Sequence, residues 1–113
     1  MPRAASSADA FNAIGEARRR DILVLLATGE QSVGEIVDRL DMLQPSVSKH
    51  LKVLRDVGLV RVRRSGKQMF YRTDAEAMRP LHEWTRHFEQ LWRHQLQKVK
   101  ERAEKSAGGT SCR

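Results

Sequence analysis

The sequence predicts a mainly helical domain that carries one small β-hairpin, and three observations lead to this prediction. Apolar residues recur every three or four positions over most of the 113 residues, as they do on one face of a helix. Between residues 60 and 72 the period changes to two, which is typical of half-exposed strands. Glycines and capping residues separate these segments. A chain of this length fits a single small domain.

Four helices are expected in the first half of the chain. Gly29 follows the second helix, where a glycine commonly ends helical backbone. Ser32 and Glu35 have the spacing of a capping box, which opens the third helix. Pro45 suits the first turn of the fourth helix, because an N–H group there has no partner to lose. The helices are expected at residues 8–14, 16–28, 32–40 and 44–57, with a tight turn at 41–43.

The second half is predicted to hold the hairpin and one long helix. The strands are expected at 60–63 and 69–72, with a basic turn at 64–67 between them. Thr73 and Glu76 suggest another capping box, which opens a helix over about 74–104 that Pro80 kinks or delays. The folded domain at 8–104 is then flanked by a flexible N-terminus at 1–7 and a Gly/Ser-rich, disordered tail at 105–113.

The net charge of +7 is concentrated in one window of the sequence. Residues 44–72 hold eight basic residues against one acid, Asp56, which equals the whole net charge, whereas basic and acidic residues balance in the rest of the chain. A positive field concentrated in this way indicates that the window meets a polyanion.

Composition argues against several classes of protein. No run approaches ~18 consecutive apolar residues, so no membrane helix is expected. The N-terminus lacks the apolar stretch of a secretion signal, and the single cysteine, Cys112, cannot form an internal disulfide, which favours a cytoplasmic location. The sequence has no glycine-rich phosphate loop, nucleophile elbow or His-Glu-x-x-His motif, and Cys112 is a poor nucleophile candidate. We therefore do not expect an enzyme.

A short helix, a tight turn and a helix with a polar outer stripe form the pattern of a helix-turn-helix, which the hairpin extends to a winged form with five helices. The fourth helix would enter the major groove of double-stranded DNA, where residues near its N-terminus reach the base edges and later ones hold phosphates. The hairpin would be a wing on the backbone or in the minor groove. Ordinary solvated surfaces are the alternative for both. The candidate contacts are Gln44, Pro45, Ser46, Ser48, Lys49, Lys52 and Arg55 on the helix and Arg63, Arg64 and Lys67 on the wing.

Four strings resemble the ArsR/SmtB family of bacterial transcriptional repressors: Arg-Arg-Arg-Asp-Ile-Leu at 18–23, Ser-Val-Gly-Glu-Ile at 32–36, Gln-Pro-Ser-Val-Ser-Lys-His-Leu-Lys-Val-Leu-Arg at 44–55, and Gly-Leu-Val at 58–60. The resemblance covers about residues 9–95 and implies a dimeric repressor that leaves its operator when an effector binds. Family base-contact positions fall on Gln44, Ser48 and Lys49, and His50 belongs to the same string. The chain departs from the family at Leu43, where a capping serine is usual, and at Glu16-Ala17, where Asp-Pro is usual.

The resemblance also implies positions for metal ligands, and none of them carries a ligand here. Those positions hold Ser32 and Gly34 near the third helix and Ala75, Ala77, Phe88 and Leu91 near the last. We therefore expect no metal and no cofactor, as in the branch of the family that does not sense metals. An unfamiliar zinc or nickel site across a dimer is the alternative, because Glu83, His87 and His94, with His82 nearby, fall on one side of a helix.

The last helix carries more large apolar side chains than one exposed helix needs. We expect them to meet a second copy of the chain, in an interface formed by Phe11, Ile14, Leu81, Trp84, Phe88, Leu91 and Trp92. In the alternative, the two tryptophans line a pocket for an apolar or aromatic effector.

The predicted function is that of a dimeric, sequence-specific DNA-binding repressor, which reads an imperfect palindrome and is released by a non-metal effector or signal. A non-specific nucleoid-type DNA-binding protein is one alternative, and a metal sensor with an unfamiliar His/Glu site is another. RNA is disfavoured because the sequence offers no exposed aromatic platform for unpaired bases.

Overall fold

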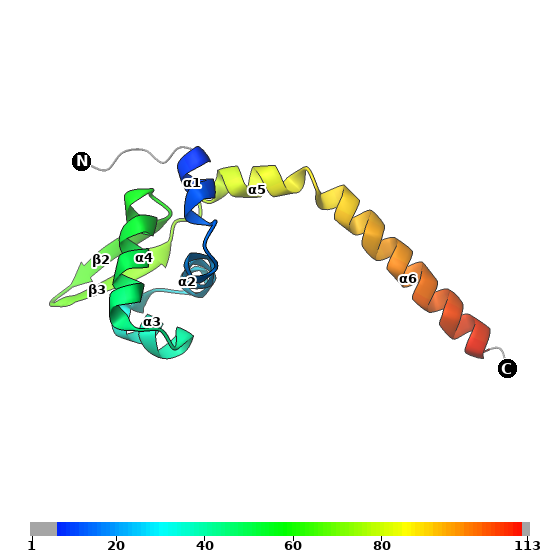
Figure 1. The fold of residues 1–113 in the computed structure, drawn as a ribbon, viewed down its shortest axis with the longest axis horizontal. Helices are drawn as coiled ribbons and strands as arrows, with labels where there is room; N and C mark the ends of the chain where they lie inside the picture. Colours follow the sequence, from blue (N-terminus) through cyan, green and yellow to red (C-terminus); the bar gives the residue numbers. More distant parts are fainter. Residues whose placement is uncertain (1–6, 112–113) are drawn as a thin grey trace. The chain divides into compact units, whose positions relative to one another are not determined.

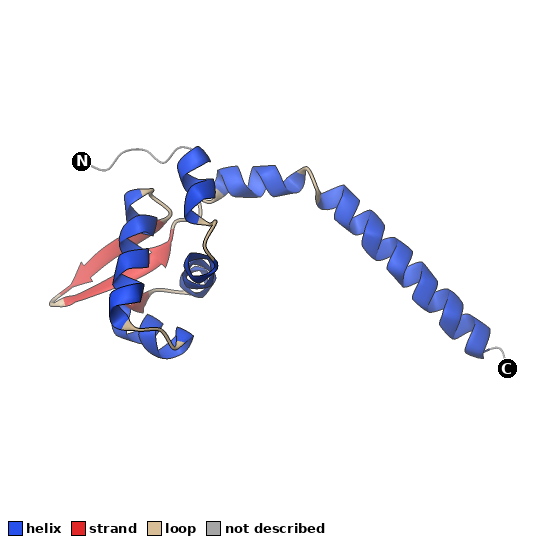
Figure 2. Cartoon of the chain, viewed as in Figure 1, coloured by secondary structure: helices blue, strands red, loops and turns tan. Residues whose placement is uncertain are grey.

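A computed structural model describes residues 7–111 of the chain. This part contains six helices and three strands, in the order α1, α2, β1, α3, α4, β2, β3, α5, α6 (Figures 1 and 2). The contacts between residues divide the chain at Leu81 into an N-terminal unit and a C-terminal unit that begins at His82. The sequence predicted five helices and two strands, so one helix and one strand are additional.

The elements have the following bounds: α1 Ser7–Ala13, α2 Ala17–Ala27, β1 Gln31–Ser32, α3 Val33–Leu40, α4 Gln44–Asp56, β2 Val60–Ser65, β3 Gln68–Thr73, α5 Arg79–Arg86 and α6 Glu89–Ser111. The first four helices agree with the predicted segments to within one or two residues, which is the usual uncertainty of a helix end.

The start of α3 shows the predicted capping box. The Ser32 hydroxyl accepts the backbone N–H of Glu35 at 3.2 Å, and the Glu35 carboxylate accepts the backbone N–H of Ser32 at 2.9 Å. Asp41 ends α3 in the left-handed conformation, with φ of 51°. This turn leads directly into α4, whose N-cap is Leu43 and has no side-chain hydrogen bond, as the departure from the family pattern predicted.

The sheet contains three antiparallel strands in the order β1-β3-β2. The predicted four-residue turn at 64–67 was wrong, because Arg64 and Ser65 still pair with Met69 and Gln68 in the ladder. The turn consists of two residues, Gly66 and Lys67, and Gly66 adopts a φ of 62° that suits glycine in a tight hairpin. The wing is therefore longer than its sequence pattern suggested.

The core of the N-terminal unit lies between α2, α3, α4 and the sheet. Its most deeply buried side chains are Ile22, Leu26, Ile36, Val47, Leu54 and Leu59. The predicted apolar stripe of α4, at Val47, Leu51 and Leu54, belongs to this cluster. Burial of this stripe fixes the rotation of α4 about its axis, so the opposite face of the helix is directed to solvent.

The predicted helix over 74–104 was wrong in its start and its continuity. The Asp74 carboxylate accepts the backbone N–H groups of Glu76 at 3.0 Å and Ala77 at 3.4 Å, whereas the Thr73 hydroxyl donates to the Leu23 carbonyl at 2.8 Å. Thr73 is thus engaged by α2 and does not form the expected capping box. Pro80 is the second residue of α5, so it delays the helix to Arg79.

A second interruption separates α5 from α6. The N–H groups of His87 and Phe88 donate to Trp84 and Thr85, three residues earlier, which is the tighter bonding typical of a helix end. After this turn α6 continues to Ser111, past the predicted end at 104 (Figure 1). The expectations for residues 1–6 and for Cys112 lie outside the described residues. In the described part of the chain, no helix is both long enough and apolar enough to cross a membrane.

Candidate nucleic-acid interface

The solvent-facing side of α4 presents the residues that the sequence singled out. Seven predicted contacts on this helix are exposed: Gln44, Pro45, Ser46, Ser48, Lys49, Lys52 and Arg55. They share a face because the buried stripe of the same helix occupies the opposite one. The structure therefore brings together hydroxyl, amide and cationic groups on one side of a helix.

The charges on this face are only partly neutralised within the chain. Lys52 pairs with Asp56, one helical turn later, with Nζ 2.9 Å from Oδ2. Both side chains are exposed, and exposed pairs of this kind contribute little to stability. Among the described residues, no acid forms an ion pair with Lys49 or Arg55. The face thus keeps a positive field that is available to an anionic partner.

His50 differs from the other predicted contacts on α4. Only 12% of its side chain is exposed, and its Nε2 lies 3.8 Å from a carboxylate oxygen of Glu16 at the N-cap of α2. Its Nδ1 is buried and has no hydrogen-bond partner among the described residues. Helical spacing could have indicated this placement, because His50 lies three residues after Val47 and four before Leu54, on the buried side.

Two of the three arginines of β2 are engaged by acids of the same chain. Arg63 forms two parallel hydrogen bonds of 2.9 Å to the Glu30 carboxylate, and its guanidinium lies 5.0 Å from the centre of the Phe70 ring. Arg61 donates to Asp74 at 2.7 Å. Glu30 lies 33 residues before Arg63, so sequence analysis of the basic window could not reveal this partner.

These ion pairs also shift the acid–base behaviour of the carboxyl groups. The hydrogen bond from Arg63 lowers the pKa of Glu30, assisted by the charges of Arg63 and Arg72. The hydrogen bond from Arg61 likewise lowers the pKa of Asp74, with further help from the backbone N–H of Ala77. Both acids remain ionised near neutral pH, and Arg63 is thereby held at the base of the wing.

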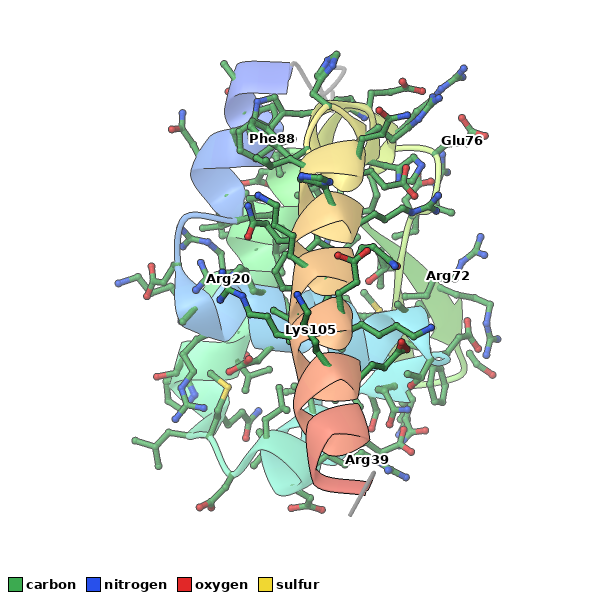
Figure 3. All side chains as sticks on the ribbon, turned by 90° about the vertical axis from the view of Figure 1, so that its right-hand side faces the viewer. Arg20, Arg39, Arg72, Glu76, Phe88 and Lys105 are labelled. Carbon is green, nitrogen blue, oxygen red and sulfur yellow. The ribbon has the colours of Figure 1, made fainter. Side chains whose placement is uncertain are left out.

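The wing carries three further basic groups, two of them at its tip. Arg64 and Lys67 are exposed, and the Arg64 Nε donates to the carbonyl of Gly66, at 3.2 Å. Arg72, which is labelled in Figure 3, is also exposed, and it pairs in the ladder with Arg61. Two like charges opposite each other do not stabilise a sheet. The hairpin therefore presents cations that its own fold does not require.

No group of three or more His, Cys, Asp or Glu side chains in the described part of one chain is arranged to hold a metal ion. Glu83, one of the candidate ligands, is 3.3 Å from Arg86 in an ion pair.

The C-terminal unit leaves large apolar side chains in solvent. Between 47% and 63% of the surface of Trp84, Phe88, Leu91 and Trp92 is exposed, and Leu96 and Val99 extend the apolar set along α6. The Trp84 and Phe88 rings meet edge to face, 5.1 Å apart.

Three predicted interface residues are placed differently, in the N-terminal unit. Leu81 is buried in its core, and Phe11 and Ile14 are partly buried against that core. Their apolar character is accounted for largely by packing within the chain.

Comparisons with known proteins agree with this geometry. A family described as "Bacterial regulatory protein, arsR family" matches residues 16–62, from the N-cap of α2 into β2. The chain is 43% identical to the biofilm growth-associated repressor of Agrobacterium fabrum over 70 residues, which is 62% of this chain and 60% of that protein's length. It is 30% identical to the transcriptional repressor SdpR of Bacillus subtilis over 78 residues, which is 69% of this chain and 87% of that protein.

A solved structure also resembles it: an ArsR-like transcriptional regulator from Rhodococcus sp. RHA1 matches with a TM-score of 0.65 and 26% identity, over 86% of this chain and 92% of that one. These relatives are transcriptional regulators rather than enzymes. With its helix-turn-helix and wing, this chain belongs to the ArsR family of bacterial transcriptional regulators.

Proposed function

We propose that the protein is a homodimeric, sequence-specific repressor that inserts α4 into the major groove of its operator and rests its wing on the adjacent backbone or minor groove. The observation that carries this proposal is the exposed face of α4, which combines base-reading side chains with cations and holds no acid before Asp56. A helix that served only to pack would not need this combination.

The first two turns of α4 supply the groups suited to base edges. The Gln44 amide matches the paired donor and acceptor of adenine, and the Lys49 ammonium matches the acceptors of guanine. The hydroxyls of Ser46 and Ser48 can pair with either a donor or an acceptor on a base edge. Pro45 fixes the start of the helix. Later residues, Lys52 and Arg55, are suited to phosphates. Sequence preference should therefore arise mainly from the N-terminal half of α4.

On the wing, we assign backbone contact to Arg64 and Lys67 at the tip. Arg63 has a different role in this proposal, because Glu30 and Phe70 already hold its guanidinium. It fixes the wing against the segment before α3, and so orients the tip. Likewise His50, which faces Glu16, would hold α4 against α2 and would not touch bases.

The dimer and the signal complete the proposal. The exposed apolar side chains of the C-terminal unit would meet the same face of a second copy, which would place two recognition helices on half-sites about 34 Å apart. With none of the family's usual metal ligands present, a non-metal effector or signal acting in the cytoplasm would release the DNA.

Selection of binding sites from random-sequence DNA, followed by fluorescence anisotropy in a salt series, tests the proposal. A palindromic site should emerge, and affinity for it should fall steeply as salt increases. Lys49→Ala should weaken binding at the selected site by about tenfold or more. Lys98→Ala removes the same charge from exposed α6 and should have little effect. Equal binding to all sequences would contradict the proposal and favour a nucleoid-type protein.

A further inference from the structure

A hollow of about 360 Å³ lies between α4 and the sheet of the N-terminal unit. Five residues of α4 and one of β3 line it: Ser48, Leu51, Lys52, Arg55, Asp56 and Tyr71. The hollow adjoins the exposed face of α4, since three of these residues belong to the same polar stripe. It lies where the recognition helix meets the strand that leads away from the wing.

The lining is suited to an anion that carries several acceptor oxygens. Lys52 and Arg55 supply positive charge, and the Ser48 and Tyr71 hydroxyls can donate hydrogen bonds. Leu51, which is buried, supplies an apolar floor. A phosphodiester carries one negative charge, shared by two non-bridging oxygens, so it could accept several hydrogen bonds and have its charge neutralised at the same time.

Tyr71 is the hydrogen-bond donor of this lining that sequence analysis did not assign to DNA contact. It pairs with Val62 in β2 and with Gln31 in β1, so its ring is fixed in the middle of the sheet and packs against the core. Its hydroxyl makes no hydrogen bond with the described residues, and it is not among their buried, unpaired polar atoms. A tyrosine in this position presents a rigid apolar ring with a polar end that is free for a ligand.

In the free protein, the Asp56 carboxylate occupies the position beside Lys52 where a bound anion would lie. The carboxylate lies 2.9 Å from the Lys52 ammonium, and both side chains are more than half exposed. Because such an exposed pair is weak, a phosphate that approached Lys52 could replace the carboxylate with little loss of stability. The negative charge of Asp56 would then lie close to the bound phosphate and repel it.

We propose that this hollow binds a phosphodiester of the DNA backbone, with Tyr71 as the donor, Lys52 and Arg55 as cations, and Asp56 as an internal competitor. This inference rests on the proposed function, because it assumes that α4 lies on DNA. It adds a neutral phosphate contact from β3 and an acidic residue that limits affinity for every sequence.

Two conservative variants test the site by fluorescence anisotropy on the selected duplex and on a scrambled one. Tyr71→Phe removes only the hydroxyl and should weaken binding to both duplexes about tenfold, without change in the salt slope or in the thermal unfolding temperature. Asp56→Asn should strengthen binding to both duplexes several-fold. Glu76→Gln, an equal change of charge at an exposed acid away from the hollow, should leave both affinities unchanged.

The outcomes separate this inference from the proposed function. Suppose that the unaltered protein prefers its selected site and that Tyr71→Phe binds both duplexes as tightly as the unaltered protein does. The hollow is then not a site for a backbone phosphate, but the proposed function stands. If the unaltered protein shows no sequence preference, the proposed function fails first. A second experiment adds inorganic phosphate at constant ionic strength and distinguishes free phosphate from the DNA backbone as the ligand. If inorganic phosphate bound to the unaltered protein but not to Tyr71→Phe, while Tyr71→Phe bound both duplexes as tightly as the unaltered protein does, the hollow would be a site for free phosphate and the backbone assignment would be overturned.

Discussion

Replacing Trp92 with alanine should convert most of the dimer to monomer at micromolar concentration. The side chain is 63% exposed in one chain, which for a tryptophan of roughly 250 Å² leaves about 160 Å² available to a partner. If the second copy covers half of that surface, the loss is about 2 kcal/mol per tryptophan at 25 cal/mol per Å². In a two-fold symmetric dimer the residue is lost from both copies, so the free energy of association falls by about 4 kcal/mol. The Kd then rises about a thousandfold.

The substitution leaves the single chain intact, because an exposed tryptophan on α6 fills no cavity and alanine favours helix. Sedimentation equilibrium over a concentration series measures the Kd directly. Trp84→Ala, at 51% exposure, should act in the same direction. Val24→Ala removes an exposed apolar side chain from α2 and serves as the matched control. An unchanged dimer in both tryptophan variants would refute the assignment of this face to a second copy.

Three further predictions concern the fold that supports the interface. Ser32→Ala should lower the free energy of unfolding by about 1 kcal/mol, measured by urea denaturation, because it removes the cap of α3. Leu54→Ala, at a fully buried position of α4, should cost about 2–5 kcal/mol in the same assay. The pKa of Glu30 is lower in the folded than in the unfolded protein, so its stabilising effect is complete above the unfolded pKa and is lost as pH falls through the folded one. Glu30→Gln should therefore flatten the acid limb of the urea midpoint plotted against pH, below about pH 5; an unaltered limb would argue against the anchor at Arg63.

Local signals in the sequence predicted much of the fold. The Ser32–Glu35 spacing, the glycine-terminated helices and the alternation after Val60 all depend on interactions within a few residues, and the structure contains each of the elements they indicated. The exposed face of α4 also followed from spacing alone, because its buried stripe is regular.

The differences arise where a residue has a distant partner. β1 is only two residues long and exists through its pairing with Tyr71 and Phe70 in β3. Thr73 is engaged by Leu23, fifty residues earlier, so Asp74 accepts the N–H groups that the expected capping box would have satisfied. Arg63 has the residue type of a DNA contact, but Glu30 holds it at the base of the wing. The role that we propose for Tyr71 could not be predicted from the sequence, because a tyrosine on a strand gives no sign that a helix lies beside it.

The central claim, that α4 reads a DNA sequence, is tested most directly by the ratio of two affinities. Anisotropy at one fixed salt concentration near physiological ionic strength gives the Kd for the selected palindrome and for a scrambled duplex of equal length. We predict a preference of ~10³-fold or more for the palindrome. A ratio near one, with the same salt dependence for both duplexes, would contradict it.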